Sequence, residues 1–132
     1  MNKISKRQHR IMRHHRVRSK IVGTAERPRV SVFKSNRNIF IQFIDDISGK
    51  TLLSNKIQKD RGEGPVRSRV FVAKTKKSKV GKTEKTASIS EMLADEAKKA
   101  GIKEVVFDRG GFKYHGRIKA VADGLRKGGI KL

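Results

Sequence analysis

The chain has 132 residues, which is enough for one domain with flexible parts, and its composition is dominated by positive charge. Lys and Arg number 34 against 12 Asp and Glu, so the formal net charge is 34 − 12 = +22. Such a charge favours a polyanionic partner, with nucleic acid as the first candidate. The absence of cysteine excludes disulfides, thiol catalysis and zinc knuckles. No apolar run approaches the roughly 20 residues of a spanning helix and no signal-peptide core is present, so we expect no membrane partner.

Residues 1–22 form a basic arm that holds eight Lys or Arg and three His without a single acid. Arg7, Arg10 and Arg13 recur every three residues, so a helix would place them along one side. Apolar residues are too sparse here for a core face. We predict a segment that is unfolded or frayed in isolation and becomes helical when phosphates neutralise it. The alternative is a solvated tail whose sequence matters little. Because the histidines have no carboxylate or thiol nearby, we expect no metal site and no other cofactor.

The first predicted strand covers residues 29–34. It places Val30 and Val32 on one face of a sheet and Ser31 and Phe33 on the other, because successive side chains of a strand alternate. Residues 23–28, which end in a proline, precede this strand as a hinge. They mark the start of a globular domain over residues 23–132.

Two further strands are predicted at residues 39–44 and 51–56, separated by polar turns. Three sequential strands with short connections form an antiparallel meander. The second strand is apolar on both faces apart from Gln42, so we expect both of its faces to be covered.

Residues 58–82 hold nine Lys or Arg and only two acids, and their second half has no apolar periodicity. A long loop of this kind inside a compact domain is usually functional or disordered. The charge favours a loop that lies along RNA over idle disorder.

A helix is predicted after this loop. Ser88 and Glu91 have the spacing of a capping box, and a start one turn earlier, near Thr83, is the alternative. Gly101 is placed to end the helix. The residues on the expected apolar face are Ile89, Met92, Leu93, Ala97 and Ala100. This face is narrow and made of small residues, so the helix should lie close to the sheet.

The fourth strand is predicted at residues 103–108. The helix before it makes a crossover connection, so this strand should run parallel to its neighbour. A last helix is predicted at residues 116–127, with an apolar face at Ile118, Val121, Ala122 and Leu125. The fold class is therefore α/β: a small mixed sheet, with three antiparallel strands and one parallel strand, two packed helices and the basic arm.

Residues 105–117 combine a short apolar strand, the pair Gly110-Gly111 and four cationic side chains around the rings of Phe112 and Tyr114. Donors for phosphate oxygens, flat faces for bases and a backbone that allows close approach suit a loop that contacts RNA. The alternative is a strand, a turn and a helix start with a solvated basic rim.

The string Phe-Asp-Arg-Gly-Gly-Phe-Lys-Tyr-His-Gly-Arg at residues 107–117 closely resembles the signature of the family of large ribosomal subunit protein eighteen. Residues 23–36, residues 94–106 and the basic start of the chain resemble the same family, in the same order. The resemblance covers most of the chain except residues 58–82. That basic stretch is longer than the family's usual linker, and an additional rRNA contact is our hypothesis for it. The short end after Leu125 looks bacterial.

The resemblance implies a structural constituent of the cytoplasmic ribosome that binds 5S rRNA. It would help to attach 5S rRNA to 23S rRNA in the central protuberance, beside the neighbouring 5S-binding protein. Carried over by motif, the rRNA contacts are Arg7, Arg10, Arg13, Arg16 and Arg18 of the arm, Arg27, Arg29, Lys34, Ser35, Asn36 and Arg37 of the first hairpin, and Arg109, Gly110, Gly111, Lys113, Tyr114, His115 and Arg117 of the signature loop.

An enzyme is not expected from these residues. Asp45 and Asp46 lie in a predicted turn, where Asp usually bonds its own backbone, and Asp108 borders Arg109, a ready ion-pair partner. The chain also lacks a Gly-rich phosphate loop and a nucleophile elbow, so we expect no small-molecule substrate. The rival function is an RNA-binding chaperone that tolerates any sequence and binds through phosphates.

Overall fold

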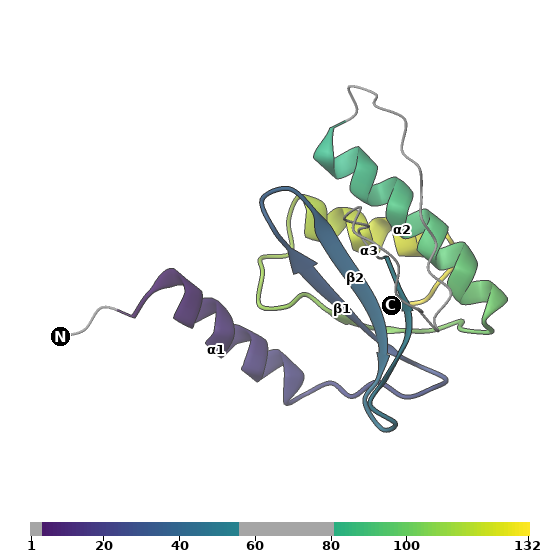
Figure 1. Ribbon diagram of the computed structural model, residues 1–132, viewed down its shortest axis with the longest axis horizontal. Coiled ribbons are helices and arrows are strands. Elements are labelled where there is room, and N and C mark those ends of the chain that lie inside the picture. The colour runs from purple at the N-terminus through teal and green to yellow at the C-terminus, as the bar shows by residue number, and fades with distance from the viewer. Residues whose placement is uncertain (1–3, 56–80) are drawn as a thin grey trace, which may run out of the picture.

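The computed structural model describes residues 4–55 and 81–132 and consists of a four-stranded sheet with helices on both sides (Figure 1). Helices α2 and α3 pack together on one face, whereas the basic helix α1 lies on the opposite side. The elements are α1 (Lys6–Arg18), β1 (Arg29–Lys34), β2 (Ile39–Asp45), β3 (Lys50–Ser54), α2 (Lys82–Lys99), β4 (Val106–Asp108) and α3 (Arg117–Lys127).

The strand order is β3-β2-β1-β4, and the predicted mixed topology is confirmed. The first three strands pair antiparallel, and β4 joins β1 in parallel, with Arg29 opposite Val106. Strand β4 is shorter than the predicted residues 103–108. The reason is that the chain around Glu104 pairs with the C-terminal segment instead, where the amide of Val105 donates to the carbonyl of Lys131.

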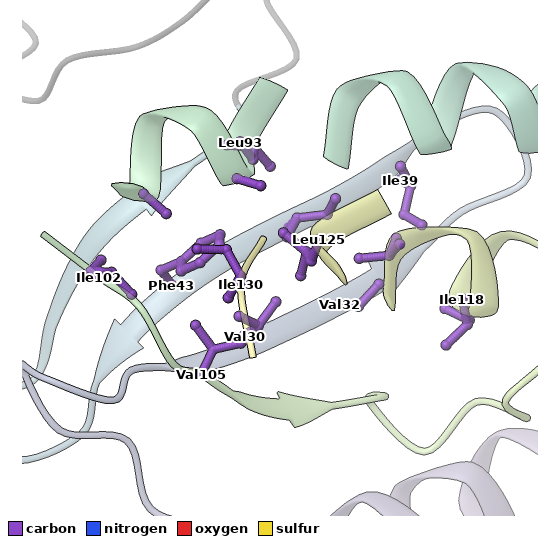
Figure 2. Packing of buried hydrophobic residues seen from close by; sticks show 14 residues of the cluster. Val30, Val32, Ile39, Phe43, Leu93, Ile102, Val105, Ile118, Leu125 and Ile130 are labelled. Atoms are coloured by element: carbon purple, nitrogen blue, oxygen red, sulfur yellow. The ribbon is translucent and has the colours of Figure 1, made fainter. Parts of the chain in front are cut away.

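The core lies between the sheet and the pair α2–α3 (Figure 2). Alternation along β1 buries Val30 and Val32 and turns Ser31 and Phe33 to the opposite face, as predicted. The residues that form the centre of this core include Ile41 and Phe43 of β2, Leu93 and Ala97 of α2, and Ile118, Val121 and Leu125 of α3. The predicted apolar face of the last helix is thereby confirmed.

The second face of the sheet is only partly covered. On β2 the side chains of Phe40, Gln42 and Ile44 keep intermediate exposure, and on β1 half of the surface of Phe33 is exposed. The expectation that both faces of β2 are covered is therefore met on the core face and only in part on the other. Helix α1 contacts the loop after β4 rather than the middle of the sheet, so it leaves these residues accessible.

Helix α2 begins at Lys82, close to the earlier of the two predicted starts, with Gly81 at its N-cap. Ser88 is not a capping residue, because its hydroxyl donates to the carbonyl of Glu84 within the helix. The amide of Gly101 is bonded to the carbonyl of Lys98, and its φ of +83° ends the helix as predicted.

The buried face of α2 is rotated from the predicted one. Thr86 and Ser90 are buried, whereas Met92 and Ala100 are exposed. The two hydroxyls donate to carbonyls one turn earlier, so their burial leaves no unsatisfied polar group. These small side chains allow α3 to come close: a Cβ built on Gly124 would lie 2.7 Å from the Cβ of Ser90.

Candidate RNA interface

Helix α1 is a cationic helix without a buried residue. It begins after a capping box in which the amide of Gln8 donates to the Ser5 hydroxyl and the amide of Ser5 donates to the Gln8 side chain. Its 13 residues hold six Lys or Arg and no acid. The predicted helix is present, but here it forms without the phosphates that we expected it to need. Because α1 buries no apolar side chain, polar contacts must determine where it lies on the protein.

Those contacts are with the pair Gly110-Gly111 of the signature loop. The guanidinium of Arg10 donates to the carbonyl of Gly110 at 3.4 Å, and Nε of Arg13 donates to the carbonyl of Gly111 at 3.1 Å. Both glycines are buried and have positive φ. A Cβ on Gly111 would collide with the backbone carbonyl of Arg10. A Cβ on Gly110 would likewise collide with the carbonyl of Val32 in β1, so the close approach predicted at these glycines is made by helix α1 and strand β1 of the chain itself.

Asp108 connects α1 to the sheet. This fully buried carboxylate lies 3.2 Å from Nε2 of His14, accepts from a guanidinium nitrogen of Arg29 at 3.0 Å, and accepts from the amide of Gly110 at 2.9 Å. This single carboxylate therefore fixes the positions of α1, the start of β1 and the signature loop relative to one another. The predicted pairing of Asp108 with its neighbour Arg109 is wrong.

Arg29 is an internal residue. Only 4% of its surface is exposed, and its guanidinium lies between Asp108 and Asp46, to which it donates at 2.7 and 2.8 Å. The hydrogen bond from Arg29 lowers the pKa of Asp46 to about 2, and the same bond raises the pKa of Arg29. The guanidinium that was predicted to contact RNA instead donates hydrogen bonds to two carboxylates of its own chain.

The sequence predicted that Asp45 and Asp46 would accept hydrogen bonds from the backbone of their own turn, and this is confirmed for Asp45 alone. Its carboxylate accepts from the amides of Ile47 and Ser48 and from the hydroxyl of Ser48, and the last of these bonds lowers its pKa most. Asp46 bonds outside the turn, to Arg29 and to the amide of Gly23. The different roles of these adjacent acids cannot be predicted from their sequence positions, because only the fold brings the buried cation Arg29 to Asp46.

The first hairpin and the signature loop lie side by side. The guanidinium of Arg117 donates to the carbonyl of Ser35 at 2.8 Å, which joins the start of α3 to the β1–β2 turn. Nζ of Lys34 lies 5.5 Å from the ring centre of Phe112, and the guanidinium of Arg10 lies 4.8 Å from the same ring. The loop, the hairpin and α1 thus lie in contact with one another and form one basic surface.

Tyr114 is held by its own chain, although 42% of it is exposed. Its ring packs edge-on against Phe107 with 6.2 Å between centroids, and its hydroxyl accepts from Arg126 at 3.0 Å. Most of the other predicted RNA contacts have exposed side chains. These residues are Arg7, Arg13, Arg16, Arg18, Arg27, Ser35, Asn36, Arg37, Lys113 and His115. Arg109 and Lys34 are partly exposed.

Two other classes of site receive no support from the residues in 4–55 and 81–132. No group of three or more His, Asp or Glu within these ranges could hold a metal ion. Likewise, none of the helices in these ranges is long and apolar enough to cross a membrane.

The fold and this surface define a basic α/β protein whose cations gather on the side of the sheet opposite α2 and α3. Comparison with known proteins identifies the family to which this chain belongs. The family model described as ribosomal L18 of archaea, bacteria, mitochondria and chloroplast matches residues 4–132. The chain is 48% identical to large ribosomal subunit protein uL18 of Bacteroides thetaiotaomicron over 127 residues, which cover 96% of this chain and 97% of that protein.

Similar proteins occur in other bacteria. The uL18 proteins of Staphylococcus saprophyticus and Herpetosiphon aurantiacus are each 43% identical over 131 residues, which cover 99% of this chain and 98% and 99% of theirs. The chain therefore belongs to the L18 family of ribosomal proteins. It is a structural protein of the large ribosomal subunit in the cytoplasmic ribosome and not an enzyme, and the predicted family and its bacterial character are confirmed.

The Arg29–Asp46 pair predicts an acid-dependent loss of stability. A carboxylate whose pKa falls from 3.8 to about 2 on folding stabilises the folded state above pH 4, and this contribution disappears as the pH falls through 2. The replacement Asp46→Asn should therefore lower the free energy of unfolding by about 2 kcal/mol at pH 6. The difference between variant and parent should shrink towards pH 2 in denaturant titrations. Asp95→Asn, at an exposed position of α2, is the control and should follow the parent. A difference for Asp46→Asn that is independent of pH would contradict the assignment.

Proposed function

We propose that this protein binds 5S rRNA and helps to attach it to 23S rRNA in the central protuberance, beside the neighbouring 5S-binding protein of the large subunit. Membership of the L18 family supports a ribosomal partner. The observation that carries the proposal is the uneven charge of the surface, since phosphates dominate protein–RNA affinity.

The charge differs between the two sides of the sheet. Helix α1 carries six Lys or Arg and no acid, whereas α2 and α3 together carry eight Lys or Arg against five Asp or Glu. The acids nearest to α1, Asp46 and Asp108, are already bonded to Arg29. A polyanion is thus attracted to the side of α1, the first hairpin and the signature loop.

The residues divide into two roles within this proposal. Arg10, Arg13, Gly110 and Gly111 hold α1 against the loop, and Arg29 supports them from inside, so their effect on RNA is one of positioning. The proposed direct contacts are Arg7, Arg16, Arg18, Arg27, Lys34, Ser35, Asn36, Arg37, Arg109, Lys113, Tyr114, His115 and Arg117. Most of residues 58–82 lie outside the described ranges, and an additional rRNA contact remains our hypothesis for them.

The proposal and the chaperone alternative differ in selectivity. Binding of this protein to 5S rRNA and to a structured RNA of matched length should be titrated in parallel at several salt concentrations. A preference for 5S rRNA of tenfold or more that persists at higher salt is expected, because shape and base contacts do not depend on released counterions. Equal affinities that fall together with salt would instead establish the sequence-tolerant chaperone.

The outward cations of α1 predict a change in salt dependence. The double replacement Arg7→Ala and Arg16→Ala should weaken RNA binding and reduce the slope of log affinity against log salt by roughly one unit for each lost phosphate contact. Helix α1 should remain intact, because alanine favours a helix. The matched control is Lys85→Ala with Lys98→Ala on exposed positions of α2, which removes the same charge from the opposite side of the sheet. An equal change of slope in both pairs would show that the side carrying α1 is not the RNA side.

A further inference from the structure

Phe33 is an exposed aromatic residue in the middle of a basic surface. It lies on β1 with its side chain on the face opposite the core, since its neighbour Val32 is buried, and half of its surface is exposed. A single exposed apolar side chain is ordinary, but an exposed aromatic ring among cations raises the question of a partner.

The ring of Phe33 is held in place by its surroundings. It meets the ring of Phe112 edge to face, with centroids 6.2 Å apart and an interplanar angle of 68°. Phe112 packs against the hydrophobic core and therefore links the exposed ring to the interior. Across the sheet, Phe33 is in register with Phe40, which is also partly exposed. A rigid aromatic surface of this kind loses little conformational entropy on binding.

The charges around Phe33 indicate which partner fits. Arg10 and Lys34 both lie over the ring of Phe112, at 4.8 and 5.5 Å, so two cations contact the ring that packs against Phe33. The next pair on the same face, Ser31 and Gln42, is polar. An apolar protein surface would have to cover these cations, whereas RNA supplies phosphates for the cations and a flat base for the ring.

We propose that Phe33 stacks on an unpaired base of the RNA that this protein binds, with Lys34 beside an adjoining phosphate. This inference rests on the proposed function and adds a base-stacking site on the open face of the sheet. The signature-loop rings do not supply an equivalent site: Phe112 lies beneath the two cations, and Tyr114 is bonded to Arg126.

The test compares variants of Phe33 in titrations with 5S rRNA at two salt concentrations. Phe33→Ala and Phe33→Leu should each lose roughly 5- to 150-fold in affinity, because stacking needs a ring, while Phe33→Tyr should stay within about threefold of the parent. The salt slope should not change in any of them, since no cation is removed. Phe33→Leu keeps an apolar contact for Phe112 and provides the test should Phe33→Ala fold poorly.

The control is Ile47→Ala, which shortens an apolar side chain that is 76% exposed in the β2–β3 turn, and it should leave affinity unchanged. The inference is overturned if Phe33→Leu binds as tightly as the parent. Phe33 would then contact a protein partner or take no part in binding. A similar loss in Ile47→Ala would also overturn it.

The outcomes separate this inference from the proposed function. A parent protein that prefers 5S rRNA, together with a Phe33→Leu variant of unchanged affinity, refutes only the stacking site. A parent that binds both RNAs equally, together with a weakened Phe33→Leu variant, refutes only the 5S assignment.

Discussion

The guanidinium of Arg29, buried between Asp46 and Asp108, is the interaction on which the basic surface depends. The three charges lie in a poorly solvated position, and loss of either of the two buried members, Arg29 or Asp108, costs about 3–5 kcal/mol. Because Asp108 also contacts His14 and the amide of Gly110, the same carboxylate that balances Arg29 determines where α1 and the signature loop lie. The protein thus uses two of its few acids to fix the position of its cations.

Much of the fold could be predicted from local patterns. Alternation along β1, the apolar spacing of α3 and the glycine that ends α2 each reflect physics contained in a few adjacent residues. The predictions that failed depend on contacts distant in sequence. Strand β4 is short because Lys131 pairs beside it, and the buried face of α2 includes Ser90 because Gly124 of α3 approaches it closely. Neither partner is visible from the segment alone.

The candidate site shows the same division. The signature loop, the hairpin and the arm were identified as basic motifs, and the structure brings them to one surface. Sequence alone could not separate outward cations such as Arg16 from Arg10 and Arg13, which bond the chain's own backbone, because all three follow the same helical spacing. The burial of Arg29 and the role of His14 were missed, since each depends on Asp108 arriving from the far end of the chain.

The most direct test of this account is amide hydrogen exchange of α1 in the protein without RNA. Arg13→Ala with His14→Ala removes contacts to the loop and to Asp108, whereas Arg7→Ala with Arg16→Ala changes outward residues. The account predicts that the parent and the outward pair keep protected α1 amides, that the inward pair loses this protection, and that β1 and β2 stay protected in all three. Equal exchange of α1 in all three proteins would contradict the claim that these contacts position the arm.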